Sequence, residues 1–207
     1  DTPPATLLRC LVAVIDSGFA PIDLLALLKH PLCSLGLERA ALLDATRRLD
    51  RKVLRGLKPA PGIEALRGLV AKAKFGAETD RTAVADLIDR LHEATADLAT
   101  FTKGAPQVLL DATIAAAEKI ATADALWAGE AGEALSDALA RLRIAWQGQP
   151  DVAFGEWPAL LAAMLAKTDL CMARSPLGGH STRCTRISWK SLDRKRRRDS
   201  SSRIISS

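Results

Sequence analysis

The residues best placed for metal chemistry in this sequence are His180 and Cys184, four positions apart. That spacing puts two ligands on one face of a helix, but the neighbouring Gly178 and Gly179 disfavour helix. A structural zinc site also needs four ligands, and no second pair follows at metal-ligand spacing. The four cysteines lie far apart, without a C-x-x-C motif: Cys10, Cys33, Cys171 and Cys184. We therefore predict no metal site, and such sparse cysteines indicate a reducing compartment, the cytoplasm.

Candidates for acid–base chemistry lack partners in the sequence. His30 follows Lys29 at the end of a predicted helix, where the helix dipole favours a cation. A catalytic histidine would need a carboxylate or cysteine beside it, so we interpret His30 as a capping or packing residue. His92 lies on a polar helix face and is interpreted as solvated. Glu130 and Glu133 fall in the first turn of a predicted helix, where the dipole explains acidic residues without a catalytic pair.

Neither nucleotide binding nor base stacking is indicated by a motif. Gly129 and Gly132 belong to no phosphate-binding loop, because no G-x-x-x-x-G-K-[ST] motif occurs and no strand precedes them. Trp127, Trp146 and Trp157 have few basic neighbours, whereas base-stacking aromatics are accompanied by basic residues. We interpret these three tryptophans as core or inter-helix anchors. The sequence thus predicts no catalytic, cofactor-binding or metal residue.

The net charge of +5 originates in the last 27 residues. Residues 181–207 contain nine Lys or Arg and two acids, a net charge of +7, whereas residues 1–180 contain 20 bases and 22 acids, a net charge of −2. The tail also has no alanine and eight serines, against four serines in the first 180 residues. Such a composition cannot bury enough apolar surface to offset chain entropy, so we predict a disordered tail.

The basic run at 194–198 leaves three interpretations open. It could bind phosphates or act as a localisation signal. It could be a solvated charge cluster without a partner. The abrupt loss of alanine with a gain of Arg and Ser is also what a shifted reading frame yields in GC-rich DNA.

The elements that must position all these residues are helices. Apolar residues make up 48% of the chain and are mainly Ala and Leu, with only 4% aromatics, a mixture that favours helix over strand. Apolar residues recur at helical spacing and no segment alternates with period two, so no strands are expected. The predicted helices cover about residues 3–16, 21–29, 38–54, 63–74, 81–101, 106–121, 130–147 and 157–167. We therefore predict an all-α, irregular array of about eight helices in residues 1–180.

The N-terminal segment indicates neither a membrane span nor a signal peptide. Its longest apolar run, residues 11–15, is too short to cross a bilayer. Asp1 stands where a signal peptide would carry positive charge. Because the chain opens on Asp rather than Met, we expect it to be a piece of a longer protein.

Five blocks of the helical part resemble one known family. They are residues 2–11 (TPPATLLRCL), 20–32 (APIDLLALLKHPL), 54–62 (LRGLKPAPG), 127–135 (WAGEAGEAL) and 175–180 (SPLGGH). Together, and in this order, they are similar to AddB, the B subunit of the AddAB helicase–nucleases, in its alphaproteobacterial form. The resemblance covers about residues 2–180 and implies an internal fragment of a much longer subunit.

The resemblance implies a role in double-strand break repair by homologous recombination. The segment corresponds to the helical portion of a degenerate helicase-like region, and the parent would join an AddA-like subunit on DNA. The family's nuclease motifs and iron–sulfur cysteines lie beyond this segment, so the resemblance assigns no catalytic, metal or cofactor residue to this sequence. The chain alone is expected neither to hydrolyse ATP nor to cut DNA. After His180 this sequence departs from the family pattern, which favours a frameshifted tail. The alternative is a non-enzymatic helical interaction module whose basic tail binds nucleic acid.

Overall fold

The computed structural model describes residues 2–55 and 60–172, with side chains up to residue 166. The chain divides into two units, residues 1–174 and residues 175–207. The second unit lies wholly outside the described residues, and so do the predicted disorder of the tail, the His180 and Cys184 pair and the basic run at 194–198.

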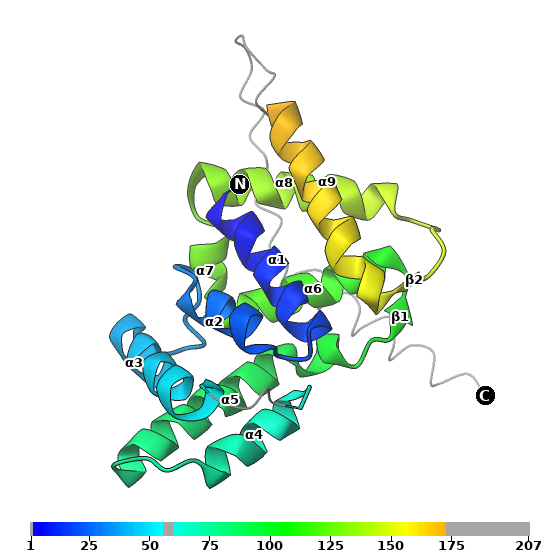
Figure 1. The fold of residues 1–207 in the computed structure, drawn as a ribbon. Helices are drawn as coiled ribbons and strands as arrows, with labels where there is room; N and C mark the ends of the chain where they lie inside the picture. The colour runs from blue at the N-terminus through cyan, green and yellow to red at the C-terminus, as the bar shows by residue number, and fades with distance from the viewer. Residues whose placement is uncertain (1, 56–59, 173–207) are drawn as a thin grey trace, which may run out of the picture. The chain divides into compact units, whose positions relative to one another are not determined.

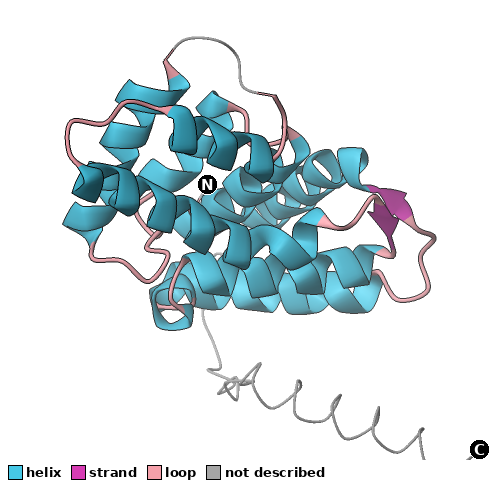
Figure 2. Ribbon diagram, turned by 90° about the horizontal axis from the view of Figure 1, so that it is seen from below, coloured by secondary structure: helices cyan, strands magenta, loops and turns pink. Residues whose placement is uncertain are grey.

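The first unit is built from helices on all sides (Figures 1 and 2). Their bounds are α1 (Pro3–Asp16), α2 (Pro21–Lys29), α3 (Arg39–Leu49), α4 (Ile63–Lys72), α5 (Glu78–Ala99), α6 (Pro106–Ile120), α7 (Ala123–Leu126), α8 (Gly129–Ala145) and α9 (Trp157–Met172). A π-helical turn, η1 (Asp50–Leu54), continues α3, and a 3-10 turn, η2 (Phe154–Glu156), precedes α9. The predicted all-α array is confirmed.

Two small features differ from the sequence-based expectation. Among the described residues there are nine α-helices rather than about eight, because α7 is a single turn and too short to show a helical period. An antiparallel pair, β1 (Lys103–Gly104) and β2 (Val152–Ala153), was not expected either. It joins two loops at the edge of the unit, where Figure 2 shows the strands in magenta. Two-residue strands leave no alternating pattern in a sequence.

Helix α1 contributes a large part of the apolar core of the unit. It packs against α2, α6, α8 and α9, and Figure 1 shows it crossing in front of α6 beside α9. Leu7, Leu8 and Leu11 are fully buried at i, i+1 and i+4, together with Val12 and Val14. We call these five residues the α1 core. Since α1 meets four other helices, its apolar residues fix the arrangement of the unit.

Gly18 ends α1 in a way that only glycine allows. Its amide donates to the Ile15 carbonyl and the next amide, of Phe19, donates to the Val14 carbonyl, which together form a Schellman cap. Gly18 has φ +64°, and a Cβ placed on it would lie 2.7 Å from Pro61 Cβ. The Gly62 amide also donates to the Gly18 carbonyl at 2.9 Å. The end of α1 therefore also positions the start of α4.

One carbonyl links the start of the unit to its middle. Ile120, the last residue of α6, accepts hydrogen bonds from the amides of Ser34 and Leu35 at 2.9 and 2.8 Å. The Ser34 hydroxyl donates to the same oxygen at 3.3 Å. The loop after α2 thus caps the C-terminal end of α6, 86 residues further along the chain.

In the part of the chain that the structure describes, no helix combines the length and the apolar character needed to cross a membrane.

Candidate nucleic-acid interface

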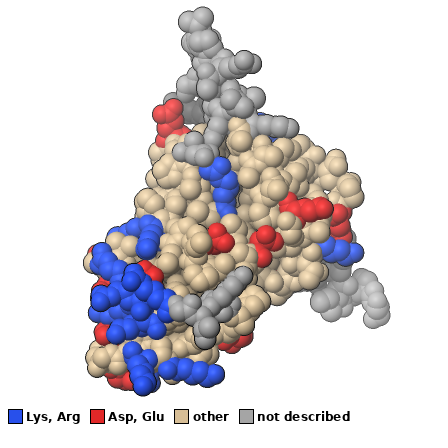
Figure 3. Space-filling model, viewed as in Figure 1, with Lys and Arg blue, Asp and Glu red and all other residues tan. Residues whose placement is uncertain are grey.

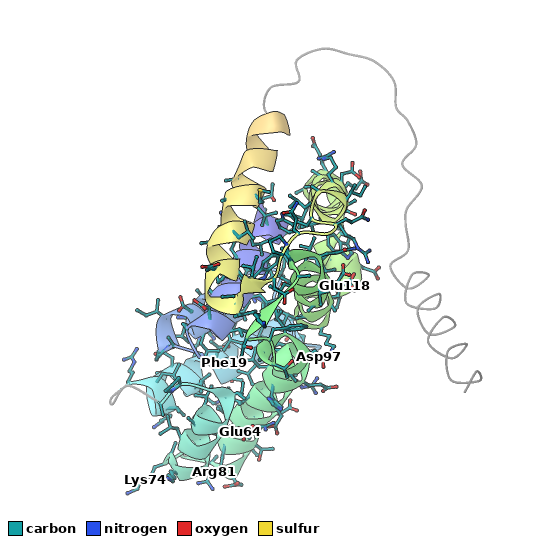
Figure 4. The ribbon with its side chains drawn as sticks, turned by 90° about the vertical axis from the view of Figure 1, so that its right-hand side faces the viewer. Phe19, Glu64, Lys74, Arg81, Asp97 and Glu118 are labelled. Carbon is teal, nitrogen blue, oxygen red and sulfur yellow. The ribbon has the colours of Figure 1, made fainter. Side chains whose placement is uncertain are left out.

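The tryptophans lie where core anchors are expected. Trp157 is fully buried, donates its indole N–H to Thr113 Oγ1 at 3.1 Å, and meets Trp146 edge-on with ring centroids 5.5 Å apart. Trp127 is half-buried and donates its indole N–H to Glu118 Oε1 at 2.8 Å. Figure 4 labels Glu118 on α6. The interpretation of Trp146 and Trp157 as core residues is confirmed, and Trp127 joins α6 to the start of α8.

His30 is a packing and capping residue, as expected from the sequence. It is buried, and its Nδ1 accepts the Leu32 amide at 3.3 Å. Its carbonyl accepts Arg39 Nη1 at 2.9 Å. Burial lowers the pKa of the imidazole, and the nearby Arg39 charge lowers it further. Because the imidazole is buried and accepts a backbone amide, it serves packing and capping.

The two cysteines whose side chains the structure describes, Cys10 and Cys33, are poorly suited to nucleophilic chemistry. Burial raises the pKa of the Cys10 thiol, and it raises that of Cys33 to about 12. Cys10 borders a shallow cavity of about 230 Å³ between α1 and α2, which Arg9 and Asp23 also line. A protonated thiol is a weak nucleophile and a weak metal ligand.

The glycines and acids at the start of α8 have structural explanations. Gly129 has φ +65°. A Cβ on Gly132 would lie 2.4 Å from the Trp127 carbonyl carbon, so the two backbones touch here. Glu130 lies in the first turn of α8 and Glu133 is exposed beside it. Over the described residues, no three His, Cys, Asp or Glu side chains gather as metal ligands would.

One surface stands out by its charge, and the sequence reading overlooked it. Five basic residues, which we call the basic face, occupy the outer side of α3 and η1 and the position directly after η1: Arg47, Arg48, Arg51, Lys52 and Arg55. The inner side of the same elements is apolar and buried, with Leu42, Leu49 and Leu54 facing the unit. Figure 3 shows blue side chains gathered over the region of α3. Helical spacing therefore separates an apolar side from a basic one.

The members of the basic face differ in how far they are neutralised. Arg48 forms ion pairs with Asp44 on its own helix and with Asp80 of α5, the latter at 3.0 Å. Arg55 lies 3.6 Å from Asp50 and its side chain is 70% exposed. The other three members are exposed and form no ion pair within the described residues: Arg47, Arg51 and Lys52. The surface thus carries uncompensated positive charge.

Neighbouring contacts hold α3 in place. Glu38 caps its N-terminus, accepting the amides of Ala40 and Ala41 at 2.9 and 3.3 Å. The Arg39 guanidinium donates to three carbonyls at the end of α2 and in the loop after it, those of Lys29, His30 and Cys33. Because α3 is tied to α2 and, through Arg48, to α5, the basic face is presented on a fixed support.

The signal for this surface is present in the sequence but local. Residues 47–58 contain six bases and one acid. The net charge summed over residues 1–180 is −2, and this sum conceals the local cluster of bases. A short sliding window combined with the helical period would have placed these bases on one side of a helix.

Comparison of the chain with protein-family models, with curated proteins and with solved structures found no match.

Proposed function

We propose that this chain is a non-enzymatic helical segment of an AddB-like subunit, acting in double-strand break repair by homologous recombination in the cytoplasm. Its partners would be an AddA-like helicase subunit and DNA. The proposal rests on the resemblance of short blocks to that family, and one structural observation supports it.

Four of the five blocks that carry the resemblance come together around α1, and the block at 175–180 lies outside the described residues. The block at 2–11 includes the start of α1, and the block at 20–32 contains α2, which packs on it. The block at 54–62 reaches the end of α1 through the Gly62–Gly18 hydrogen bond. The block at 127–135 opens α8, which also packs on α1. Segments that determine the fold are the ones a related protein would share, which is why this gathering favours common descent over chance similarity.

The proposal assigns no chemistry to the chain by itself. In the resembled family the nuclease motifs lie beyond the matching segment. The test is an ATP-dependent exonuclease assay on the purified 207-residue chain with linear duplex DNA, alone and mixed with an AddA-like subunit. We expect no nuclease activity from the chain alone and association with the AddA-like subunit in a pull-down. Nuclease activity of the chain alone, or lack of association, would contradict the proposal.

The coding DNA around codon 180 gives an independent check. If the chain derives from an AddB-like gene by a frameshift, an AddB-like reading frame resumes in another phase after that codon. Absence of such a frame in any phase would contradict this origin for residues 181–207.

The charge of the tail favours a second candidate, a helical interaction module whose basic tail binds nucleic acid. The tail carries a net charge of +7. This candidate predicts a salt-dependent affinity for DNA that disappears when the five basic residues at 194–198 are replaced by Gln in the full chain. Unchanged affinity would contradict it.

A further inference from the structure

We infer that the basic face of α3 and η1 binds the phosphate backbone of duplex DNA. This inference deepens the proposed function and rests on it, because it names the surface by which a DNA-repair segment would meet its nucleic acid. The binding site lies in the helical unit and is separate from the tail.

The spacing of the basic residues suits a linear polyanion. Arg47 and Arg51 are four residues apart where α3 continues into η1, Arg48 and Lys52 are spaced in the same way, and Arg55 follows η1 in extended backbone. The face thus presents its five cations along a short stretch of one chain segment. Like charges at i, i+4 repel by a few tenths of a kcal/mol, and a row of phosphates would relieve that repulsion.

The acidic residues nearby hold the basic face in position but neutralise only part of its positive charge. Asp44 of α3 and Asp80 of α5 both bind Arg48, and the Asp80 pair ties the face to α5. Asp50 lies near Arg55 at 3.6 Å, at the edge of an exposed arginine. Arg47, Arg51 and Lys52 lie between these pairs without an acid of their own among the described residues, which leaves three cations for phosphates.

Several basic residues elsewhere in the described unit are paired with acids or stand alone. Arg67 is bound by Glu64 at 2.8 Å and Asp89 at 2.7 Å. Figure 4 shows Lys74 and Arg81 at the end of the unit formed by α4 and α5, where Arg81 faces Glu78 at 3.5 Å. Lys103 on β1 and Arg141 on α8 are exposed single charges. These last two are suitable controls for the basic face.

The composition of α3 and η1 favours duplex DNA over single strands. Single-stranded nucleic acid is bound largely by aromatic side chains on which bases stack. Residues 39–55 contain no aromatic residue. They contain no Asn or Gln either, the side chains that typically read adenine. The contacts expected here are therefore charge contacts to phosphates, tolerant of sequence.

The test compares two double variants of the full chain that lose the same charge, R47Q/R51Q on the basic face and K103Q/R141Q away from it. Affinity for a 20-base-pair DNA duplex is measured by fluorescence anisotropy from 50 to 300 mM salt. The same variants are also made with residues 194–198 replaced by Gln, so that the tail cannot mask the result. Thermal melts accompany each variant, because all four positions are exposed and none should unfold the chain.

We expect R47Q/R51Q to weaken duplex binding on the order of tenfold at 150 mM salt, and to reduce the slope of log affinity against log salt by about 2. K103Q/R141Q should change affinity less than about twofold, and a single strand of the same length should bind more weakly than the duplex. Equal losses in both double variants would show a mere net-charge effect and overturn the inference. Unchanged binding in R47Q/R51Q, or preference for the single strand, would overturn it too. Neither result would touch the proposed function, which is tested separately by the exonuclease assay and by association with an AddA-like subunit.

Discussion

Helices α1 and α3 both carry an apolar side, but they differ in how much of their surface other helices cover. Helix α1 meets four other helices, and the α1 core is closed to solvent. Helix α3 with η1 packs by its inner side alone and turns five basic residues outward. In α1, seven of the fourteen residues are buried and only Pro3 and Asp16 are exposed. In α3 and η1, five of the sixteen residues are buried, and the outer side carries the exposed Arg47, Arg51 and Lys52. Four predictions test how far that division extends.

The largest effect is expected in the α1 core. Replacing fully buried Leu11 by Ala leaves a cavity among four helices and should lower the free energy of unfolding by about 2–5 kcal/mol. Ile22, which is 83% exposed on α2, is the control, and I22A should change stability by less than about 0.5 kcal/mol. Urea unfolding followed by circular dichroism measures both. A small effect of L11A would mean that α1 is not the centre of packing.

Two helical glycines should respond with opposite signs. By helix propensity alone, Gly-to-Ala substitution stabilises a helix by about 1 kcal/mol. Gly68 of α4 has open space around it, so G68A should follow that rule. Gly132 of α8 touches the Trp127 backbone, so G132A should cost about 1–3 kcal/mol through overpacking. Thermal melts of the two variants decide the matter, and a stabilising G132A would contradict the close approach of these backbones.

A pH effect should come from His30. Its folded-state pKa is lowered by burial, so the unfolded chain binds the proton more readily than the folded one. The resulting stability is complete above the unfolded-state pKa of about 6.5 and is lost as the pH falls from that value through the lower folded-state pKa. Urea unfolding at pH 7 and pH 5 should show a smaller loss for H30Q than for the wild-type chain. Equal losses in both would argue against a buried, neutral His30.

The smallest effect is expected on the basic face itself. R48Q removes ion pairs to Asp44 and Asp80, but the arginine side chain is 34% exposed, so the loss should stay below about 1 kcal/mol. R47Q removes a charge without a partner among the described residues and should change stability by less than about 0.5 kcal/mol. Chemical denaturation measures both. A destabilising R47Q would indicate that this arginine serves the fold rather than a ligand.

The sequence predicts the helices well because their limits depend on local chemistry. Prolines open α1, α2 and α6 at their first positions, and Gly18 and Pro31 stand where α1 and α2 end. Features that depend on tertiary contacts were not predicted from the sequence. Examples are the close approach of Gly132 to Trp127 and the antiparallel pair of β1 and β2. The basic face was missed for another reason. Its residues are adjacent in the sequence, but charge summed over the whole helical part conceals a local cluster.

The hydrogen bonds to the Ile120 carbonyl bear on how the unit folds and opens. They close a loop of 86 residues, and the entropic cost of this closure is not offset by the formation of individual helices. The contact can form only when the region of α1 and α2 and the region of α6 meet, late in assembly. The Ser34 and Leu35 amides should then exchange with solvent deuterium only when these regions separate, so two adjacent amides report on the cooperative opening of the whole unit.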